Sequence, residues 1–412
     1  MNALKFIAIV LTLALLGSLT SPGIAHPISS QIKAAEGSFP WVLQLFESVN
    51  FSSISTSFGG VRQVPMLSYI LPDGHTHRVA TKWFTPLNQC GPGNAWSCHD
   101  FDLDIMGGYE SGTMSDMAVQ PITDETEYRV GWVFLNESGQ IRHFYRLFGS
   151  SGNQISVFNE TLYNLPDDHT IIGHPSLAYD SDGKPRVALL LRYSDIQFPA
   201  DKLLYISYSG SSNTSCDTSS MWQCDLIGSA TGMWSYHGSP VLALNASDQP
   251  RIVYTASYIS GDFLQYAYPQ ANPDYSPNCG PSDNTWRCIT ITGDNYEITG
   301  LDMDMGSTNP QVAYTIAVTD LITETHLQYA KRVGTLGGDC GTDKVWFLTG
   351  VVETETWDCS TITPTDDNGF SQDVTIQVDA DNQPLIAYRE NDTGGYWDLR
   401  LFHGDPETDH TD

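Results

Sequence analysis

The stretch HPSLAYDSDGKPRVALL, residues 174–190, joins two short apolar runs through a turn of Asp, Ser, Gly and Pro. Runs of this kind, separated by turn residues, are typical of paired antiparallel β-strands. The turn, its proline and the β-rich run that follows return three more times, with successive prolines 65, 60 and 74 residues apart. A period of this size predicts an array of similar structural units. The prolines are Pro185, Pro250, Pro310 and Pro384.

The cysteines provide a second landmark, because they fall in four local pairs and each pair ends in the triplet Trp-Xaa-Cys. The chain has eight cysteines and lacks the Cys-Xaa-Xaa-Cys spacing that favours zinc. In an exported chain, an even number of paired cysteines predicts disulfides within single repeats and no metal site. The pairs are Cys90 with Cys98, Cys216 with Cys224, Cys279 with Cys288, and Cys340 with Cys359.

A third landmark, an apolar-Xaa-Tyr strand, lies between the other two. It occurs at 203–205, 264–266 and 327–329. Each copy is therefore predicted to form a four-stranded antiparallel meander, and helix signals are nearly absent. One such sheet cannot bury both faces alone, so the copies must pack face to face and close radially. The sequence predicts an all-β fold, a six-bladed β-propeller of four-stranded antiparallel blades with intrablade disulfides.

The repeat also predicts boundaries inside one propeller domain at 26–412. The last copy has three strands, so residues 28–35 are predicted to supply its fourth strand, because an open sheet edge pairs readily with other chains. The predicted blades span about 38–102, 103–166, 167–230, 231–293, 294–363 and 366–403.

The first 25 residues have the pattern of a secretory signal peptide. Lys5 precedes an apolar run at 6–16, and small residues lead to a predicted cleavage site after Ala25. That run is shorter than the roughly 20 residues of a membrane-spanning helix, and no later segment approaches this length. We therefore expect a secreted protein without a membrane span, either extracellular or periplasmic.

The formal net charge is −29, from 48 acidic and 19 basic residues. A surface this acidic repels phosphate groups, which argues against nucleic acid and anionic membranes as partners. Two interpretations of the charge remain. It keeps the protein soluble in an extracellular medium, or it forms a field that attracts cations and basic ligands.

The segment 174–185, followed by the strand at 203–205 and by Trp222, resembles a repeat found in many secreted bacterial β-propeller proteins. More distantly it is similar to the Asp-box propellers, which include sialidases. The strict Asp-box pattern, Ser-Xaa-Asp-Xaa-Gly-Xaa-Xaa-Trp, is absent from this chain. The resemblance implies a propeller and does not imply an activity.

Candidate functional residues follow from a simple rule: a residue found in every repeat serves the fold, whereas a residue found once is free to serve a ligand. The recurring Trp of Trp-Xaa-Cys is accordingly expected to pack against its disulfide. In propellers the connections between blades and between second and third strands share one face, where sites normally lie. The singular residues predicted there are Trp234, His237, Asp302, Asp373, Arg389, His174 and Arg192. The competing interpretation is ordinary loop surface, with the arginines in salt bridges.

Two classes of function fit these residues. The first is a secreted propeller that binds extracellular carbohydrate or surface polymers through this face without turning them over. The alternative is a carbohydrate-active enzyme, a sialidase-like glycoside hydrolase or a polysaccharide lyase, that uses the same mouth. A purely structural or partner-binding role is a third option. No cofactor is predicted, although the turn at Asp180 and Asp182 has calcium binding as an alternative to simple turn chemistry. The sequence leaves the oligomeric state open.

Overall fold

The computed structural model of the chain describes residues 52–403. Gaps fall in connecting segments at 60–63, 83–88, 91–95, 109–112, 122–126, 150–153, 194–199, 211–220 except Cys216, 270–285 except Cys279, 364–373, 392–396 and several shorter ones. The predicted signal peptide and the predicted closing strand at 28–35 lie outside this part. Within it, no helix is long and apolar enough to cross a membrane.

The described residues form six antiparallel sheets, numbered here 1 to 6 in chain order. Sheet 1 holds β1 (Ser52–Gly59), β2 (Val64–Ile70), β3 (Thr76–Lys82), β5 (Trp96–Asp102) and β4 (Gln89–Cys90), and the short 3-10 helix η3 (Leu103–Met106) follows it. Sheet 2 holds β6 (Ala118–Pro121), β7 (Glu127–Leu135), β8 (Gln140–Gly149) and β9 (Gln154–Asn164). Sheet 3 holds β10 (His169–Tyr179), β11 (Pro185–Tyr193), β12 (Ala200–Tyr208) and β13 (Trp222–Thr231).

The remaining sheets continue the same order of strands. Sheet 4 holds β14 (Ser235–Leu244), β15 (Pro250–Tyr258), β16 (Gly261–Pro269) and β17 (Trp286–Gly293). Sheet 5 holds β18 (Glu297–Met305), β19 (Pro310–Thr319), β20 (Thr323–Gly334), β22 (Gly350–Thr363) and β21 (Cys340–Phe347). Sheet 6 holds β23 (Val374–Val378), β24 (Pro384–Asn391) and β25 (Trp397–His403). The predicted all-β class of antiparallel sheets is confirmed, and sheets 2, 3 and 4 have the predicted four strands. Sheets 1 and 5 each have a fifth strand, β4 and β21, and sheet 6 has three described strands.

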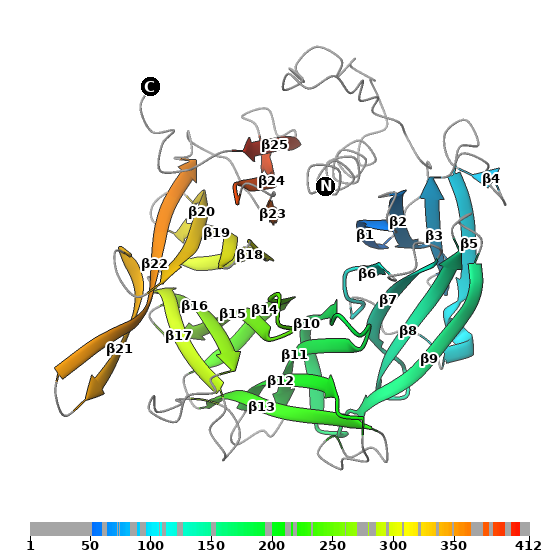
Figure 1. Ribbon diagram of the computed structural model, residues 1–412, viewed down its shortest axis with the longest axis horizontal. Helices are drawn as coiled ribbons and strands as arrows, with labels where there is room; N and C mark the ends of the chain where they lie inside the picture. Colours follow the sequence, from blue (N-terminus) through cyan, green and yellow to red (C-terminus); the bar gives the residue numbers. More distant parts are fainter. Residues whose placement is uncertain are drawn as a thin grey trace.

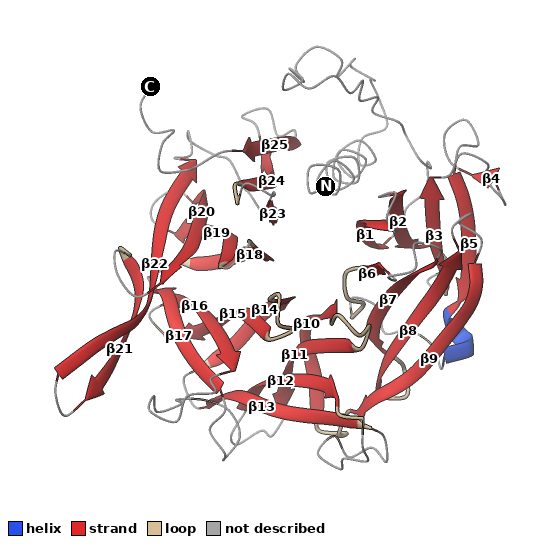
Figure 2. Cartoon of the chain, in the orientation of Figure 1, coloured by secondary structure: helices blue, strands red, loops and turns tan. Residues whose placement is uncertain are grey.

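The sheets are arranged around a common centre (Figure 1), and strands make up nearly all of the described regular structure (Figure 2). The first strand of each of sheets 2 to 6 lies toward the middle of the view, and the last strands lie toward the outside. Neighbouring sheets contact each other through these inner strands, as β10 does with β14, β14 with β18, and β18 with β23. The arrangement is β-propeller-like.

Two copies of the recurring turn owe their shape to one Asx side chain each. Between β10 and β11, Oδ1 of Asp180 accepts hydrogen bonds from the backbone N–H groups of Asp182 at 3.1 Å and Lys184 at 2.7 Å. Gly183 has a φ of 75°, which a residue without Cβ adopts without strain. Asn245 makes the same pair of bonds at the next copy of the turn. The repeat motif that predicts the strands therefore keeps an Asx residue because the backbone N–H groups of the turn bind its side chain.

Three of the predicted disulfides are present: Cys216–Cys224, Cys279–Cys288 and Cys340–Cys359. Each ties the segment after the third strand of a sheet to the strand that follows. Cys98 is also disulfide-bonded, whereas the side chain of Cys90 lies outside the described part.

The tryptophans of the three triplets that carry these disulfides, Trp222, Trp286 and Trp357, are buried and share hydrophobic clusters with them. Two of them also reach into the preceding sheet. Trp286 of sheet 4 meets Tyr205 of sheet 3 edge-on, with ring centroids 5.3 Å apart, and Trp357 of sheet 5 meets Tyr266 of sheet 4 at 5.1 Å. The triplet thus joins adjacent sheets as well as closing its own.

One polar network lies between sheets 2 and 3. His143, fully buried on β8, has Nδ1 3.0 Å from a carboxylate oxygen of Glu160 and Nε2 2.9 Å from the hydroxyl of Tyr179. The hydroxyl fits there because residue 131 is glycine: a Cβ on Gly131 would lie 1.8 Å from it. Burial lowers the pKa of His143. All three polar groups are satisfied within the protein, so this network serves packing.

Candidate functional site

One exposed and two half-buried aromatic side chains gather at one end of sheet 4. Trp234 immediately precedes β14 and keeps 41% of its surface exposed. Its ring lies 4.8 Å from that of Tyr258 and 5.2 Å from that of Phe263, centroid to centroid. Ile259, the residue after Tyr258, is 77% exposed. These four residues, called the aromatic rim below, form an apolar surface that a ligand can reach.

A close histidine–aspartate contact lies beside the aromatic rim. Nε2 of His237, on β14, is 2.9 Å from Oδ2 of Asp262 at the start of β16. The same carboxylate accepts hydrogen bonds from the Ser257 hydroxyl at 2.6 Å and from the backbone N–H of Ile298, in sheet 5, at 2.8 Å. Burial raises the pKa of Asp262, but the hydrogen bonds from His237, Ser257 and Ile298 outweigh it, so the pKa lies below its ordinary value. Asp262 is therefore held as an anion.

Sheet 3 has an equivalent group at the same end. Arg192, at the end of β11, donates two hydrogen bonds to Asp201, of 2.9 and 3.0 Å. Asp201 accepts the backbone N–H of Tyr236, in sheet 4, at 2.7 Å, and Arg192 also donates to the Tyr236 carbonyl at 3.1 Å. Arg192 thus binds a carboxylate of this chain, that of Asp201, and not the carboxylate of a ligand. Its guanidinium lies one residue from His237 along the inner strand of sheet 4.

Two other predicted residues lie on inner strands. His174, on β10, has an exposed side chain, and its backbone N–H donates to the Ser239 hydroxyl of β14 at 2.8 Å. Asp302, on β18, accepts two hydrogen bonds from sheet 6 through Oδ2, one from the Ile376 N–H and one from the Thr375 hydroxyl, both at 2.8 Å. Asp302 therefore holds sheets 5 and 6 together.

Asp116, just before β6, completes what we call the axial group: Asp116, His174 and Asp302. Desolvation raises the pKa of Asp116, and the charge of His174 opposes the shift. Burial raises the pKa of Asp302 to about 7, and the Asp116 charge adds to that rise. Asp116 nevertheless exposes a large part of its surface.

The structure does not test two of the predicted site residues. Asp373 lies outside the described residues. Arg389 is placed on β24, where it pairs with Leu399 of β25, but its side chain is not among those described. Of the other five, Trp234, His237 and Arg192 lie near one another at the junction of sheets 3 and 4. His174 and Asp302 belong to the axial group.

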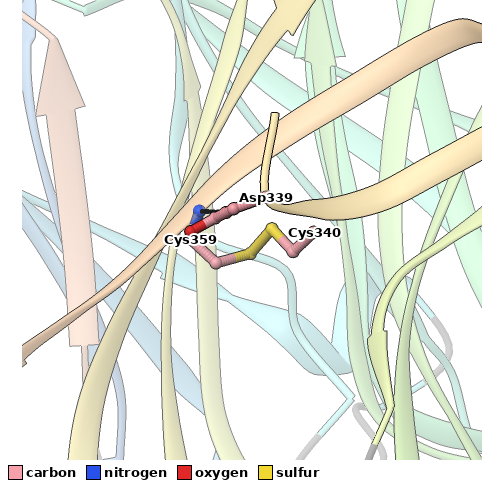
Figure 3. A group of neighbouring side chains, drawn as sticks. All are labelled: Asp339, Cys340 and Cys359. Atoms are coloured by element: carbon pink, nitrogen blue, oxygen red, sulfur yellow. Dashed lines mark hydrogen bonds between the residues drawn. A yellow bond between two sulfur atoms is a disulfide. The ribbon is translucent and has the colours of Figure 1, made fainter. Parts of the chain in front are cut away.

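Within the described ranges, one cluster has metal-ligand residue types close together: Asp339, Cys340 and Cys359 (Figure 3). Its two sulfur atoms are joined in a disulfide, and Oδ1 of Asp339 accepts the Cys359 N–H at 2.8 Å. Disulfide sulfurs are not thiolate ligands, so these residues do not suit a metal. At the Asp180 turn, Oδ2 is bound by Arg186 and Oδ1 by backbone N–H groups. Calcium binding there stays a prediction.

Sequence reasoning missed Asp201, Asp262 and Asp116. For the first two a signal exists, because both begin the pattern Asp-Xaa-Leu-Xaa-Tyr at 201–205 and 262–266. Asp116 has no comparable signal, since it stands in an irregular segment before a short strand.

No known protein-family model matches this chain, and no curated protein matches it. Three solved structures illustrate the similarity that exists. AofleA from Arthrobotrys oligospora is 8% identical with a TM-score of 0.41, covering 87% of this chain and 84% of its own. The polysaccharide lyase Uly1 is 10% identical with a TM-score of 0.42, covering 86% and 91%. A Trypanosoma rangeli sialidase is 9% identical with a TM-score of 0.38, covering 87% and 57%. TM-scores of this size do not establish a common fold.

Proposed function

We propose that this protein is a secreted propeller that binds extracellular carbohydrate or surface polymers at the aromatic rim, without turning them over. The observation that carries the proposal is the exposed Trp234 ring, which Tyr258 and Phe263 flank. Three residues after Trp234 comes His237, which contacts Asp262. Aromatic faces stack on the apolar face of a sugar ring, and adjacent charged groups bind its hydroxyls. The binding class is favoured because the carboxylates of both groups here, Asp201 and Asp262, are engaged in joining sheets.

The architecture that goes with this function has six blades and matches that of secreted bacterial propeller repeat proteins. Residues 1–25 are the signal peptide, the propeller occupies 26–412 with the blade ranges given above, and residues 28–35 pair with sheet 6, which has three described strands. Deleting residues 26–37 should lower the melting temperature or cause aggregation, because it leaves an open edge. A truncated protein as stable and monomeric as the full chain would contradict this closure.

Binding is tested with a glycan array on the purified protein, its Trp234→Ala variant and a control. Phe158→Ala is the matched control, because Phe158 is also an exposed aromatic residue, 46% exposed, but lies on β9 in sheet 2. We expect Trp234→Ala to weaken binding about 10-fold or more, as loss of a stacked ring does in other aromatic contacts of about 1 to 3 kcal/mol. Phe158→Ala should change little.

The array has two outcomes that remove the proposal. Either no glycan binds, or binding is equal in the two variants. Incubation with the best-bound glycan tests the non-catalytic part, since new reducing ends or unsaturated products would assign the protein to the carbohydrate-active enzymes.

A further inference from the structure

The aromatic rim of sheet 4 has a counterpart at the same end of sheet 3. The second and third strands of the two sheets pair in the same register, because Arg192 is opposite Asp201 in sheet 3 as Ser257 is opposite Asp262 in sheet 4. Both aspartates also begin the pattern Asp-Xaa-Leu-Xaa-Tyr. Three residues of sheet 3 therefore occupy the places of Trp234, Tyr258 and Phe263, and they are, in that order, His169, Tyr193 and Lys202.

These three counterparts contact one another, as the residues of the aromatic rim do. The ring centroids of His169 and Tyr193 are 5.2 Å apart, and Nζ of Lys202 lies 5.7 Å from the Tyr193 centroid. The same Nζ is 2.9 Å from Nε2 of His169. On the other side of the imidazole, Nδ1 is 2.7 Å from Oδ1 of Asp168. We call Asp168, His169, Tyr193 and Lys202 the polar rim.

The hydrogen-bond roles within the polar rim follow from Lys202. An ammonium only donates, so Nε2 of His169 accepts, and Nδ1 carries the hydrogen that it donates to Asp168. This bond lowers the pKa of Asp168, which is therefore held as an anion. Among the described residues, the ammonium donates one hydrogen bond, the one to His169, so two of its three N–H groups are left for a ligand.

The polar rim is both ordered and accessible. The His169 side chain is only 8% exposed, and its backbone N–H donates to the Pro166 carbonyl at 2.9 Å, which fixes the connection from β9 to β10. Asp168, by contrast, exposes 53% of its side chain, and Lys202 is half-buried. A buried imidazole thus holds an ammonium on one side and an exposed carboxylate on the other.

The two rims lie on adjoining sheets, since β10 packs against β14 (Figure 1). Arg192, next to Tyr193 on β11, donates to the Tyr236 carbonyl of β14 at 3.1 Å. Tyr236 in turn is two residues after Trp234. A chain of sugar residues that stacks on Trp234 and extends toward sheet 3 therefore meets the polar rim.

We propose that the polar rim is a second carbohydrate subsite, and that the glycan is an uncharged polymer which the two rims bind together. The inference rests on the proposed function, because it takes the aromatic rim as the first subsite. Lys202 donates to one hydroxyl of a sugar residue, and Asp168 accepts another. The opposite charges of this pair favour hydroxyls over a charged substituent, and the net charge of −29 disfavours an acidic polymer.

The test is calorimetric titration of the purified full-length protein with cello-, manno- and xylo-oligosaccharides of two and six sugar residues, and with hexagalacturonate as the acidic probe. We expect a hexasaccharide to bind about 10-fold or more tightly than its disaccharide, because it gains hydrogen bonds to charged groups. Lys202→Met should reduce this ratio to about 2-fold or less and leave the disaccharide affinity unchanged. Trp234→Ala should weaken the binding of both.

Lys184→Met is the matched control. Lys184 also belongs to sheet 3 and lies over a tyrosine ring, 4.7 Å from the Tyr208 centroid, but it stands in the β10–β11 turn at the other end of the strands. This variant should keep the full preference for the hexasaccharide. Asp168→Asn changes an exposed side chain and should lower the hexasaccharide affinity about 3-fold or more. If Lys202→Met is misfolded, as loss of disaccharide binding would show, Asp168→Asn decides in its place.

A preference for the hexasaccharide that survives Lys202→Met overturns the inference, as does tighter binding of hexagalacturonate than of every neutral hexasaccharide. If the disaccharides bind in a Trp234-dependent way and the hexasaccharides bind no more tightly, the inference fails and the proposed function stands. If neither the glycan array nor the titration shows a bound glycan, the proposed function fails first.

Discussion

Asp262 and Asp302 perform the same structural task at successive junctions, yet their acidities shift in opposite directions. Each accepts the N–H of a residue on the inner strand of the next sheet at 2.8 Å, from Ile298 and Ile376 respectively. The pKa of Asp262 is lowered, with His237 the largest opposing influence to burial. The pKa of Asp302 is raised to about 7 by burial, and its charged neighbour is the like-charged Asp116. The nearby charges are the weakest influences on both: hydrogen bonds, that from His237 first, outweigh burial at Asp262, whereas burial outweighs the hydrogen bonds at Asp302.

The largest effect on the free energy of unfolding should come from removing the carboxylate of Asp262, which is held as an anion. Asp262→Ala leaves the Ile298 N–H, the Ser257 hydroxyl and the His237 ring without their acceptor, which should cost about 2 to 3 kcal/mol of unfolding free energy. Urea denaturation at pH 7 measures this. Asp182→Ala, an exposed turn position, should stay within about 0.5 kcal/mol of the unaltered protein. A loss at Asp262 as small as the control's would show that the junction between sheets 4 and 5 does not need it.

The second effect is a pH dependence that Asp302 contributes. Its folded pKa of about 7 exceeds the ordinary value of 3.8. The folded state then binds more protons, so the stabilisation is complete below about pH 3.8 and is lost as the pH rises through 7. Between pH 5 and 8 we expect a loss of about 1 to 2 kcal/mol, limited because water reaches part of the side chain. Denaturation curves should show this loss in the unaltered protein and much less of it in Asp302→Asn, which carries no charge. Parallel pH profiles for the two proteins would refute it.

The smallest effect lies at acid pH and has the opposite sign. Because the folded pKa of Asp262 is below 3.8, its stabilisation is present above that value and is lost as the pH falls through the folded value. His237→Ala removes the opposing cation, so it should reduce the loss between pH 5 and 3 by about 1 kcal/mol or less. Thermal unfolding at the two pH values compares the variants. An acid loss unchanged by His237→Ala would mean that Ser257 and Ile298 alone set the charge of Asp262.

The features that recur in the chain predicted most of the local structure. The Pro-containing turns predicted hairpins because Asp180 and Asn245 bind the same backbone N–H groups, and the Trp-Xaa-Cys triplets predicted three disulfides now present. The partners of the singular residues were not predictable in this way. Asp302 binds Ile376, 74 positions away, because two sheets meet there, and no local pattern encodes that distance. Arg192 illustrates the reverse, since its partner Asp201 was only nine positions away and marked by Asp-Xaa-Leu-Xaa-Tyr.

The contact of Trp286 with Tyr205, and of Trp357 with Tyr266, has a direction: the tryptophan comes later in the chain than the tyrosine that it meets. A sheet that has just formed therefore finds its docking partner already made, and assembly can proceed from sheet 3 to sheet 5 in the order of the chain. Coupling of this kind is between nearest neighbours, as it is in repeat proteins. Replacing Tyr205 or Tyr266 should speed amide hydrogen exchange in its own sheet and in the next one. More distant sheets should stay protected against exchange.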